Sequence, residues 1–195
     1  GEYVMKNAAL RCKYWNDMGH PEYHVNVNLS VVQLLQNDIV KKVAKVLEET
    51  RIIPQNLTLE VTESLAINDM VRMKKILGVR VALDDFGTGY SSLNHIREMP
   101  LDVIKIDRCF IEHLGEDDFS NAFVRMVSEL ANAINVRVCV EGVETKQQRD
   151  IVKQMGIRMI QGFFYGKPMK IEEFEKKFIN LHTNINSNNN ITSSL

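Results

Sequence analysis

Polar side chains that could bind a cation or carry a proton stand at the carboxyl end of every β-strand that the sequence predicts. In chain order they are Asn28, Glu60, the adjacent pair Asp84 and Asp85, Lys105, Glu141 and Gln161. Carboxylates gathered out of water cost several kcal/mol per ion, so a site of this composition predicts a bound divalent cation. Oxygen ligands suit Mg²⁺, Mn²⁺ or Ca²⁺, and no cluster of His or Cys favours zinc. Adjacent Asp84 and Asp85 could bridge two ions, an arrangement that supports in-line displacement at phosphorus.

The elements that must position these side chains alternate regularly along the chain. Alternating apolar residues predict strands, and apolar residues at helical spacing predict helices. We expect strands at 23–29, 57–61, 79–84, 103–106, 136–141 and 157–161, and helices at 4–15, 37–49, 67–77, 91–98, 119–134, 146–155 and 172–178. This order predicts an α/β fold with a parallel sheet, either an open doubly wound sheet or a (β/α) barrel. In both architectures, sites form at the carboxyl ends of the strands.

Residue parity predicts that the polar strand ends share one face of the sheet. Side chains two residues apart in a strand lie on the same face, and the pairs 26/28, 58/60, 82/84, 139/141 and 159/161 each end in a polar group. Large aliphatic residues such as Val27 and Leu83 have the opposite parity. We expect the aliphatic face to pack against helices and the polar face to point toward a barrel axis.

Composition excludes several other classes of protein. The chain has 195 residues, of which 45% are hydrophobic, with 24 Lys+Arg against 25 Asp+Glu, so it lacks the basic balance of a duplex nucleic-acid binder. Cys12, Cys109 and Cys139 show no metal or disulfide spacing, which favours a cytoplasmic setting. No apolar run is long enough to span a membrane. We also expect no membrane contact by this chain. We expect one domain over 1–180 and a polar, disordered tail over 181–195.

Six segments resemble, in the same order, the motif set of the EAL-domain cyclic di-GMP phosphodiesterases. They are Val25–Ser30, Leu59–Ser64, Ala82–Leu93, Lys105–Asp107, Glu141–Thr145, and Gln161–Phe163 continued by Lys167–Pro168. The run DDFGTGYSSL, which begins at Asp84, is highly specific by itself. The resemblance extends from about Gly1 to Phe178.

This resemblance implies a TIM-like (β/α) barrel that hydrolyses cyclic di-GMP to the linear dinucleotide pGpG with two Mg²⁺ or Mn²⁺ ions. One ion would be bound by Asn28, Glu60 and Asp84, and the second by Asp84 and Asp85 with Glu141 close by. Glu141 would help to activate the attacking water. The other implied roles are Lys105 orienting that water and offsetting negative charge, Gln161 in the shell of water and metal, and Glu63 bracing the loop 86–92. The loop and helix after Asp85 would also mediate a homodimer.

Two departures from the family pattern carry expectations of their own. The Glu-Ala-Leu strand that names the family, whose Glu is a metal ligand, has no counterpart here, so we expect the first strands of the barrel to be absent and this chain alone to hydrolyse little or nothing. The connection around 66–75 is also shorter than is usual for the family.

Other interpretations of the same residues remain open. Singly, Asn28 could form a turn, the three strand-end carboxylates could cap helices, and Lys105 could pair with Asp107. As a set, they could belong to an inactive EAL-type receptor that binds cyclic di-GMP or a protein partner, or to another two-metal barrel enzyme. The run from Gly87 to Gly89 lacks the lysine of a phosphate-binding P-loop, which favours a structural turn.

Overall fold

The computed structural model describes residues 1–34, 36, 38–62, 67–88 and 93–179. The chain forms two compact units, Gly1–Tyr165 and Gly166–Leu195. The first unit holds all six described strands. In the second, a short helix α8 (Ile171–Phe174) continues into a π-helical segment η4 (Glu175–Ile179), and the rings of Phe174 and Phe178 lie 5.1 Å apart.

Strands and helices alternate through the first unit as expected. The strands are β1 (Val25–Leu29), β2 (Leu57–Thr62), β3 (Arg80–Phe86), β4 (Val103–Ile106), β5 (Arg137–Val140) and β6 (Met159–Ile160). The α-helices are α1 (Glu2–Asp17), α2 (Val31–Leu34), α3 (Ile39–Thr50), α4 (Ile67–Arg72), α5 (Leu93–Glu98), α6 (Asp118–Ala133) and α7 (Lys146–Gln154). Shorter segments are η1 (Pro54–Asn56), η2 (Met73–Leu77) and η3 (Arg108–Phe110).

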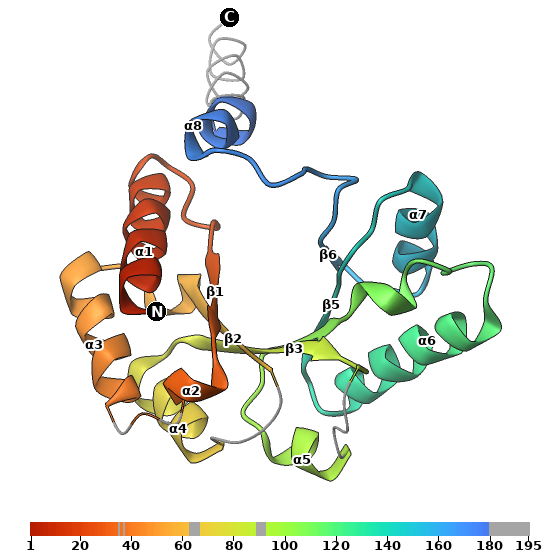
Figure 1. The fold of residues 1–195 in the computed structure, drawn as a ribbon, viewed down its shortest axis with the longest axis horizontal. Helices are drawn as coiled ribbons and strands as arrows, with labels where there is room; N and C mark the ends of the chain where they lie inside the picture. The colour runs from red at the N-terminus through yellow and green to blue at the C-terminus, as the bar shows by residue number, and fades with distance from the viewer. Residues whose placement is uncertain (35, 37, 63–66, 89–92, 180–195) are drawn as a thin grey trace, which may run out of the picture. The chain divides into compact units, whose positions relative to one another are not determined.

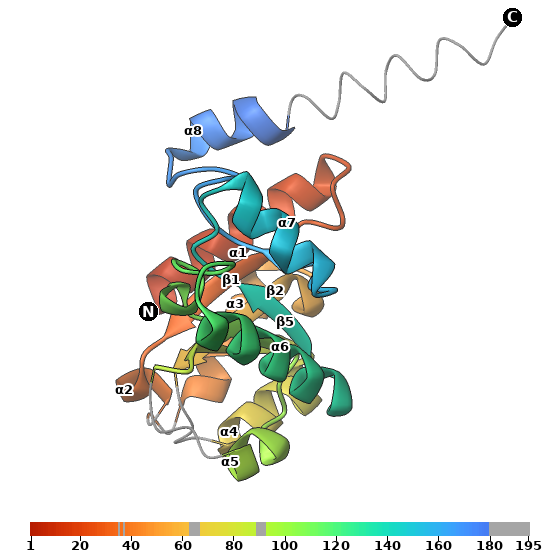
Figure 2. The same ribbon diagram turned by 90° about the vertical axis from the view of Figure 1, so that its right-hand side faces the viewer.

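The six strands form one parallel sheet in the order β1-β2-β3-β4-β5-β6. A doubly wound sheet reverses its strand order at a switch point, whereas a barrel adds each new strand beside the last. The observed order therefore decides between the two architectures that the sequence left open, in favour of the barrel type. Figures 1 and 2 show the sheet of this unit curling, with its helices along the outer side.

The two faces of the sheet differ as residue parity predicted. Buried aliphatic residues, including Val27, Leu59 and Leu83, join the main core beneath the helices. On the opposite face, the smaller side chains of Ala82, Val103 and Cys139 form a separate cluster, against which Met159 packs. The inner face is therefore lined by small residues near the middle of the strands, which leaves room for polar groups at their ends.

Three local features were not expected from the sequence. The helix α2 has only four residues, too few to show a helical repeat. The segment η2 continues α4 with π-helical rather than α-helical hydrogen bonding. Strand β6 ends at Ile160, so Gln161 follows the strand instead of closing it.

None of the described helices is long and apolar enough to cross a membrane. The predicted tail 181–195 lies outside the described residues.

The helix α7 begins with a capping box that directly follows the strand-end motif after β5. The Thr145 hydroxyl accepts a hydrogen bond from the backbone N–H of Gln148 at 3.2 Å, and the Gln148 side chain accepts one from the N–H of Thr145 at 3.0 Å. The same Gln148 side chain donates to the carbonyl of Ile111 at 2.9 Å, which ties α7 to the segment after β4.

We expect Thr145→Ala to lower the free energy of unfolding by about 1 kcal/mol, because it removes the oxygen that caps the helix. Urea denaturation would measure the loss. Thr145→Ser keeps the hydroxyl and serves as the control. Equal stability of the alanine variant and the native chain would contradict the cap.

Candidate active site

Four charged side chains from four successive strands converge on the inner face of the sheet. Lys105 on β4 places Nζ 2.7 Å from Oε1 of Glu60 on β2, 2.8 Å from Oδ1 of Asp84 on β3, and 2.8 Å from Oε1 of Glu141, which follows β5. Glu60 and Lys105 are only 5% and 3% exposed. We call these four residues the lysine cluster. Lys105 pairs with these three carboxylates, and Asp107 instead accepts a hydrogen bond from the backbone N–H of Cys109 at the start of η3.

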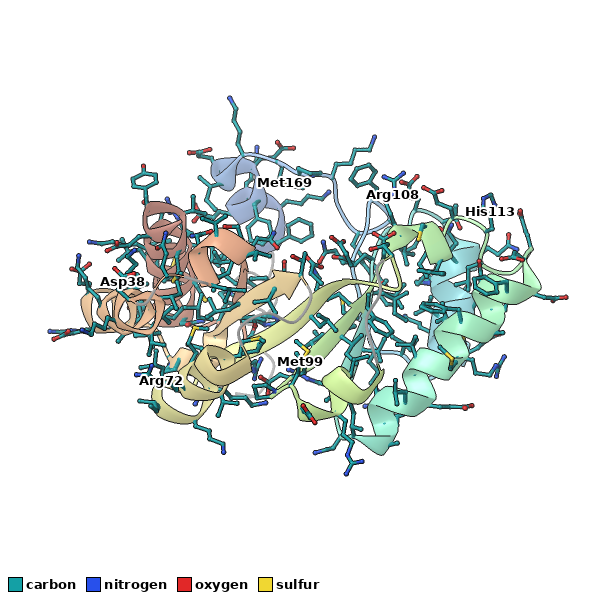
Figure 3. All side chains as sticks on the ribbon, turned by 60° about the horizontal axis from the view of Figure 1, so that its bottom comes forward. Asp38, Arg72, Met99, Arg108, His113 and Met169 are labelled. Carbon is teal, nitrogen blue, oxygen red and sulfur yellow. The ribbon has the colours of Figure 1, made fainter. Side chains whose placement is uncertain are left out.

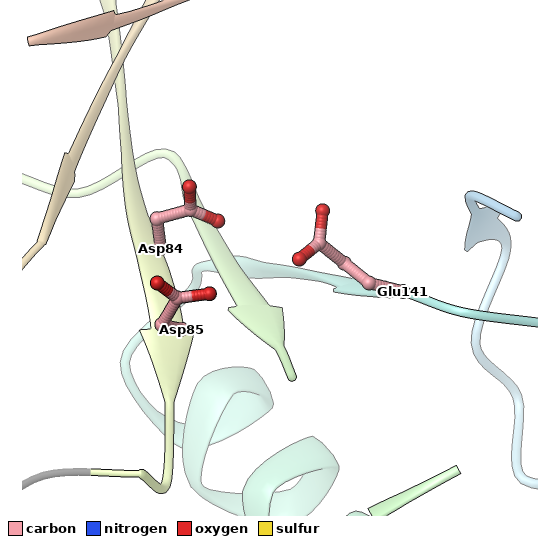
Figure 4. A group of neighbouring side chains, drawn as sticks. All are labelled: Asp84, Asp85 and Glu141. Atoms are coloured by element: carbon pink, nitrogen blue, oxygen red, sulfur yellow. The ribbon is translucent and has the colours of Figure 1, made fainter. Parts of the chain in front are cut away.

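A β-bulge brings the second aspartate of the pair to the same site. Leu83 lies opposite Ile104 and Phe86 opposite Ile106, so Asp84 and Asp85 together oppose the single residue Lys105. Asp85 has a φ of 53°, in the left-handed region. In a regular strand two adjacent side chains point to opposite faces, but a bulge redirects one of them. Figure 4 shows both aspartate side chains extending toward Glu141, and ligand oxygens of the three carboxylates lie within 4.8 Å of one another.

The left-handed conformation of Asp85 is testable without any activity measurement. We expect Asp85→Gly to be more stable than Asp85→Ala by about 1 kcal/mol, because both variants lose the carboxylate but only glycine accepts a positive φ without strain. Chemical denaturation of the two variants side by side gives the difference. An alanine variant as stable as the glycine variant would show that residue 85 does not need a left-handed backbone.

The electrostatics of the site favour a bound cation. Burial raises the pKa of the Glu141 carboxyl above its ordinary value, against the hydrogen bond from Lys105. Burial, and then the neighbouring Asp84 and Asp107, raise the pKa of Asp85. Burial alone would lower the pKa of Lys105, but its hydrogen bonds to Asp84, Glu141 and Glu60 outweigh this and hold it above the ordinary value. Lys105 therefore stays charged, and its single positive charge is outnumbered by the negative charges of the neighbouring carboxylates.

The donor set fits a hard divalent cation. Oδ1 of Asp84 is buried, and the ammonium of Lys105, 2.8 Å away, also faces Glu60 and Glu141. All the candidate ligands are oxygens, as Mg²⁺ and Mn²⁺ prefer.

The nearby Arg108 does not belong to the lysine cluster. It lies at the surface after β4 and pairs with Glu112 at 2.7 Å (Figure 3).

Two of the remaining predicted site residues, Asn28 and Gln161, are among the described residues but are not members of the lysine cluster. Asn28 is exposed and lies beside Glu60 in the register of β1 and β2. Gln161 has an exposed side chain, and its backbone N–H donates to the carbonyl of Val140 at 2.8 Å. Glu63 lies outside the described residues, as does the part of its predicted loop over 89–92.

Sequence reasoning missed one direct partner of the cluster. The amide nitrogen of Asn26 donates to Oε1 of Glu60 at 2.8 Å, so Glu60 is held by both an amide and the ammonium of Lys105. The signal was present, since Asn26 lies two residues before Asn28, the register partner of Glu60, and therefore shares its face of the sheet.

The fold and the site together define a TIM-like (β/α) half-barrel with an acidic centre at the carboxyl ends of its strands that could bind a cation. The chain belongs to the EAL domain family, whose model matches residues 1–168. It is 36% identical over 179 residues to the bifunctional diguanylate cyclase/cyclic di-GMP phosphodiesterase MucR of Pseudomonas aeruginosa, covering 89% of this chain and 26% of that protein. It is 35% identical over 182 residues to the cyclic di-GMP phosphodiesterase PdeR of Escherichia coli, covering 90% of this chain and 27% of that protein.

Solved structures show the same fold. The chain matches a structure of the P. aeruginosa MucR phosphodiesterase in complex with c-di-GMP with a TM-score of 0.82 and 37% identity, over 89% of this chain and 73% of the other. It matches the EAL domain of Mycobacterium smegmatis DcpA with a TM-score of 0.84 and 33% identity, over 92% of this chain and 84% of the other. The predictions of fold class and family are therefore confirmed. The chain spans about a quarter of the length of MucR and PdeR.

Proposed function

We propose that the gene product carrying this chain is a phosphodiesterase that hydrolyses cyclic di-GMP to linear pGpG. The observation that carries the proposal is the lysine cluster beside Asp85, a buried ammonium among carboxylates on the inner face of a barrel-type sheet. The names of MucR and PdeR, which this chain resembles over about nine-tenths of its length, support cyclic di-GMP as the substrate.

The residues present fit two Mg²⁺ or Mn²⁺ ions. Asn28, Glu60 and Asp84 would contribute to one site, and Asp84, Asp85 and Glu141 to the other. Bound divalent ions polarise a phosphodiester and lower the pKa of a coordinated water. The excess of carboxylate over ammonium is the feature of this chain that supports such ions.

The protein's own groups would then position a water molecule and move its proton. Glu141 would accept that proton as a general base. The ammonium of Lys105 would orient the water and offset the negative charge that develops on the phosphodiester. Glu60 and its partner Asn26 would hold Lys105 in place, and Gln161 would hydrogen-bond within the shell of water around the ions.

The homodimer and the cellular location are parts of the same proposal. We place the dimer contact on the loop and helix after Asp85, of which the structure describes Phe86–Thr88 and the backbone of α5. Analytical ultracentrifugation of the gene product would test it, and a monomer at micromolar concentration would argue against it. The free thiols of Cys12, Cys109 and Cys139 are compatible with the reducing cytoplasm.

The direct test is to incubate the purified gene product with cyclic di-GMP in the presence of Mg²⁺ or Mn²⁺ and to follow the nucleotides by chromatography. We expect linear pGpG to accumulate, and a chelator to stop its formation. Binding of cyclic di-GMP without turnover would instead establish an inactive receptor. A gene product that neither binds nor hydrolyses cyclic di-GMP would overturn the proposed substrate.

A further inference from the structure

Four phenylalanine rings form a stack that reaches from the exposed side of α6 to the backbone just after the β-bulge. They are Phe119 and Phe123 on α6, Phe110 at the end of η3, and Phe86 at the end of β3. The rings of Phe110 and Phe123 are stacked with centroids 3.8 Å apart and planes at 15°. Phe123 also lies 6.2 Å from Phe86 and 6.3 Å from Phe119. We call these four residues the aromatic stack.

The inner end of the aromatic stack lies directly against Gly87. A Cβ atom at residue 87 would lie 2.5 Å from the ring of Phe110 and 2.6 Å from the ring of Phe123. Gly87 also has a φ of 105°, which side chains rarely accept. The two rings therefore leave the backbone at this point no space in which to move toward α6.

The turn between Asp85 and Gly87 is held from its other end by Thr88. The Thr88 hydroxyl donates to the carbonyl of Asp85 at 2.9 Å, and the Thr88 backbone N–H approaches the same carbonyl at 3.3 Å. The left-handed φ of Asp85 thus belongs to a short turn with hydrogen bonds on one side and two aromatic rings on the other. A non-glycine residue keeps a strained backbone conformation only where several surrounding contacts together hold it there.

We propose that Phe123 and Phe110 are positioning residues for the cation site, acting through Gly87 on the β-bulge. By packing against Gly87, they keep Asp85 in the left-handed conformation that turns its carboxylate toward Asp84 and Glu141. Without them the segment can relax toward a regular strand, in which adjacent carboxylates point to opposite faces. The inference rests on the proposed cation site but not on the identity of the substrate.

The test compares two truncations of side chains on α6, only one of which belongs to the aromatic stack. Phe123→Leu removes a ring of the aromatic stack. Val127→Ala, one turn further along α6, removes two methyl groups from a fully buried side chain and serves as the matched control. Mn²⁺ affinity is measured by titration calorimetry or electron paramagnetic resonance, well below the melting temperature of each variant.

We expect Phe123→Leu to weaken Mn²⁺ binding about tenfold or more, the usual size of an effect from a residue that orients a metal ligand. Val127→Ala should lower the melting temperature and leave the affinity unchanged. Equal affinities of the Phe123→Leu variant and the native chain would overturn the proposal, as would an equal loss in the Val127→Ala variant. Phe110→Leu, which alters a half-buried ring on η3, is the second variant if Phe123→Leu does not fold.

A second measurement needs no metal. The three-bond coupling between HN and Hα of Asp85 depends on φ, so NMR of the metal-free protein reports whether the bulge persists. We expect the coupling to change in Phe123→Leu and to stay the same in Val127→Ala. An unchanged coupling in Phe123→Leu overturns the positioning role. A protein that binds Mn²⁺ and responds to Phe123→Leu but does not hydrolyse cyclic di-GMP would refute the proposed function and leave this inference standing.

Discussion

Replacing Glu141 with glutamine is expected to lower the rate of cyclic di-GMP hydrolysis by about 10²–10⁴-fold, the contribution of a general base, while the metal-free protein becomes more stable. Glutamine has nearly the same shape as glutamate and cannot accept the proton of the attacking water. It also removes a half-buried negative charge from a site that already holds an excess of carboxylate. The combination of lost activity and raised stability separates a chemical role from a folding defect.

The pH dependence of this gain follows from the raised pKa of Glu141. A carboxyl whose pKa is higher in the folded chain than its ordinary value of 4.5 binds more protons when folded, so its ionisation destabilises the fold as the pH rises. The Glu141→Gln variant does not ionise at this position. Its advantage over the native chain should therefore be absent well below pH 4.5 and should grow as the pH rises through the folded pKa.

The control for Glu141→Gln is Glu129→Gln, the same chemical change on the exposed part of α6. Thermal melts across a range of pH would be made on both variants, and a steady-state hydrolysis assay on the same two substitutions in the gene product that carries this chain. Unchanged hydrolysis in Glu141→Gln would refute the assignment of Glu141 as the base. A fall in the stability of the metal-free Glu141→Gln variant at neutral pH would contradict the excess of negative charge.

Replacing Lys105 with methionine is expected to destabilise the metal-free protein by about 3–5 kcal/mol, the cost of removing one partner from a buried ion pair. Methionine fills a similar volume but leaves Glu60, Asp84 and Glu141 with no ammonium between them. Because those carboxylates repel one another, added Mn²⁺ should restore more stability to this variant than it adds to the native chain. Hydrolysis should also fall, since the positive charge that would offset the negative charge developing on the phosphodiester is gone.

The sign of the pH dependence is opposite to that of Glu141. The pKa of Lys105 is raised above its ordinary value of 10.5, so its contribution is fully present below pH 10.5 and is lost as the pH rises through the folded pKa. The difference in unfolding free energy between the native chain and Lys105→Met should be constant from neutral pH to about pH 10 and should shrink above that. Lys41→Met, on the exposed face of α3, is the matched control. A loss no larger than that of Lys41→Met would contradict the ion-pair geometry.

The sequence was informative about the site wherever the relevant rule is local. Parity within a strand predicted that Glu60 and Asp84 share a face with small residues such as Ala82, because successive side chains in any strand alternate. The alternation of strands and helices predicted a parallel sheet, and therefore a common edge for Lys105 and Glu141. Which of two parallel architectures it was depended on the family resemblance, since helical and strand periodicity are the same in both.

Partners across the sheet were less predictable. Lys105 could have paired with Asp107, two residues away, and the choice of Glu60, Asp84 and Glu141 depends on the register of four strands. Asn26 was seen only as a member of a polar face, and its hydrogen bond to Glu60 follows from the register of β1 and β2. Register is a property of pairing between distant segments, so no local pattern fixes it.

The chain of 195 residues by itself determined the alternating elements, the polar strand ends and the chemical character of a site made of oxygen ligands and one lysine. Only the tertiary structure decided how two adjacent aspartates can serve the same site. Asp84 and Asp85 would point to opposite faces of a regular strand, and they meet beside Glu141 because a bulge opposite Lys105 gives Asp85 a left-handed backbone. That conformation is unfavourable for an isolated non-glycine residue. It persists where Thr88 and the aromatic rings on Gly87, which come from separate parts of the chain, leave the backbone no better alternative.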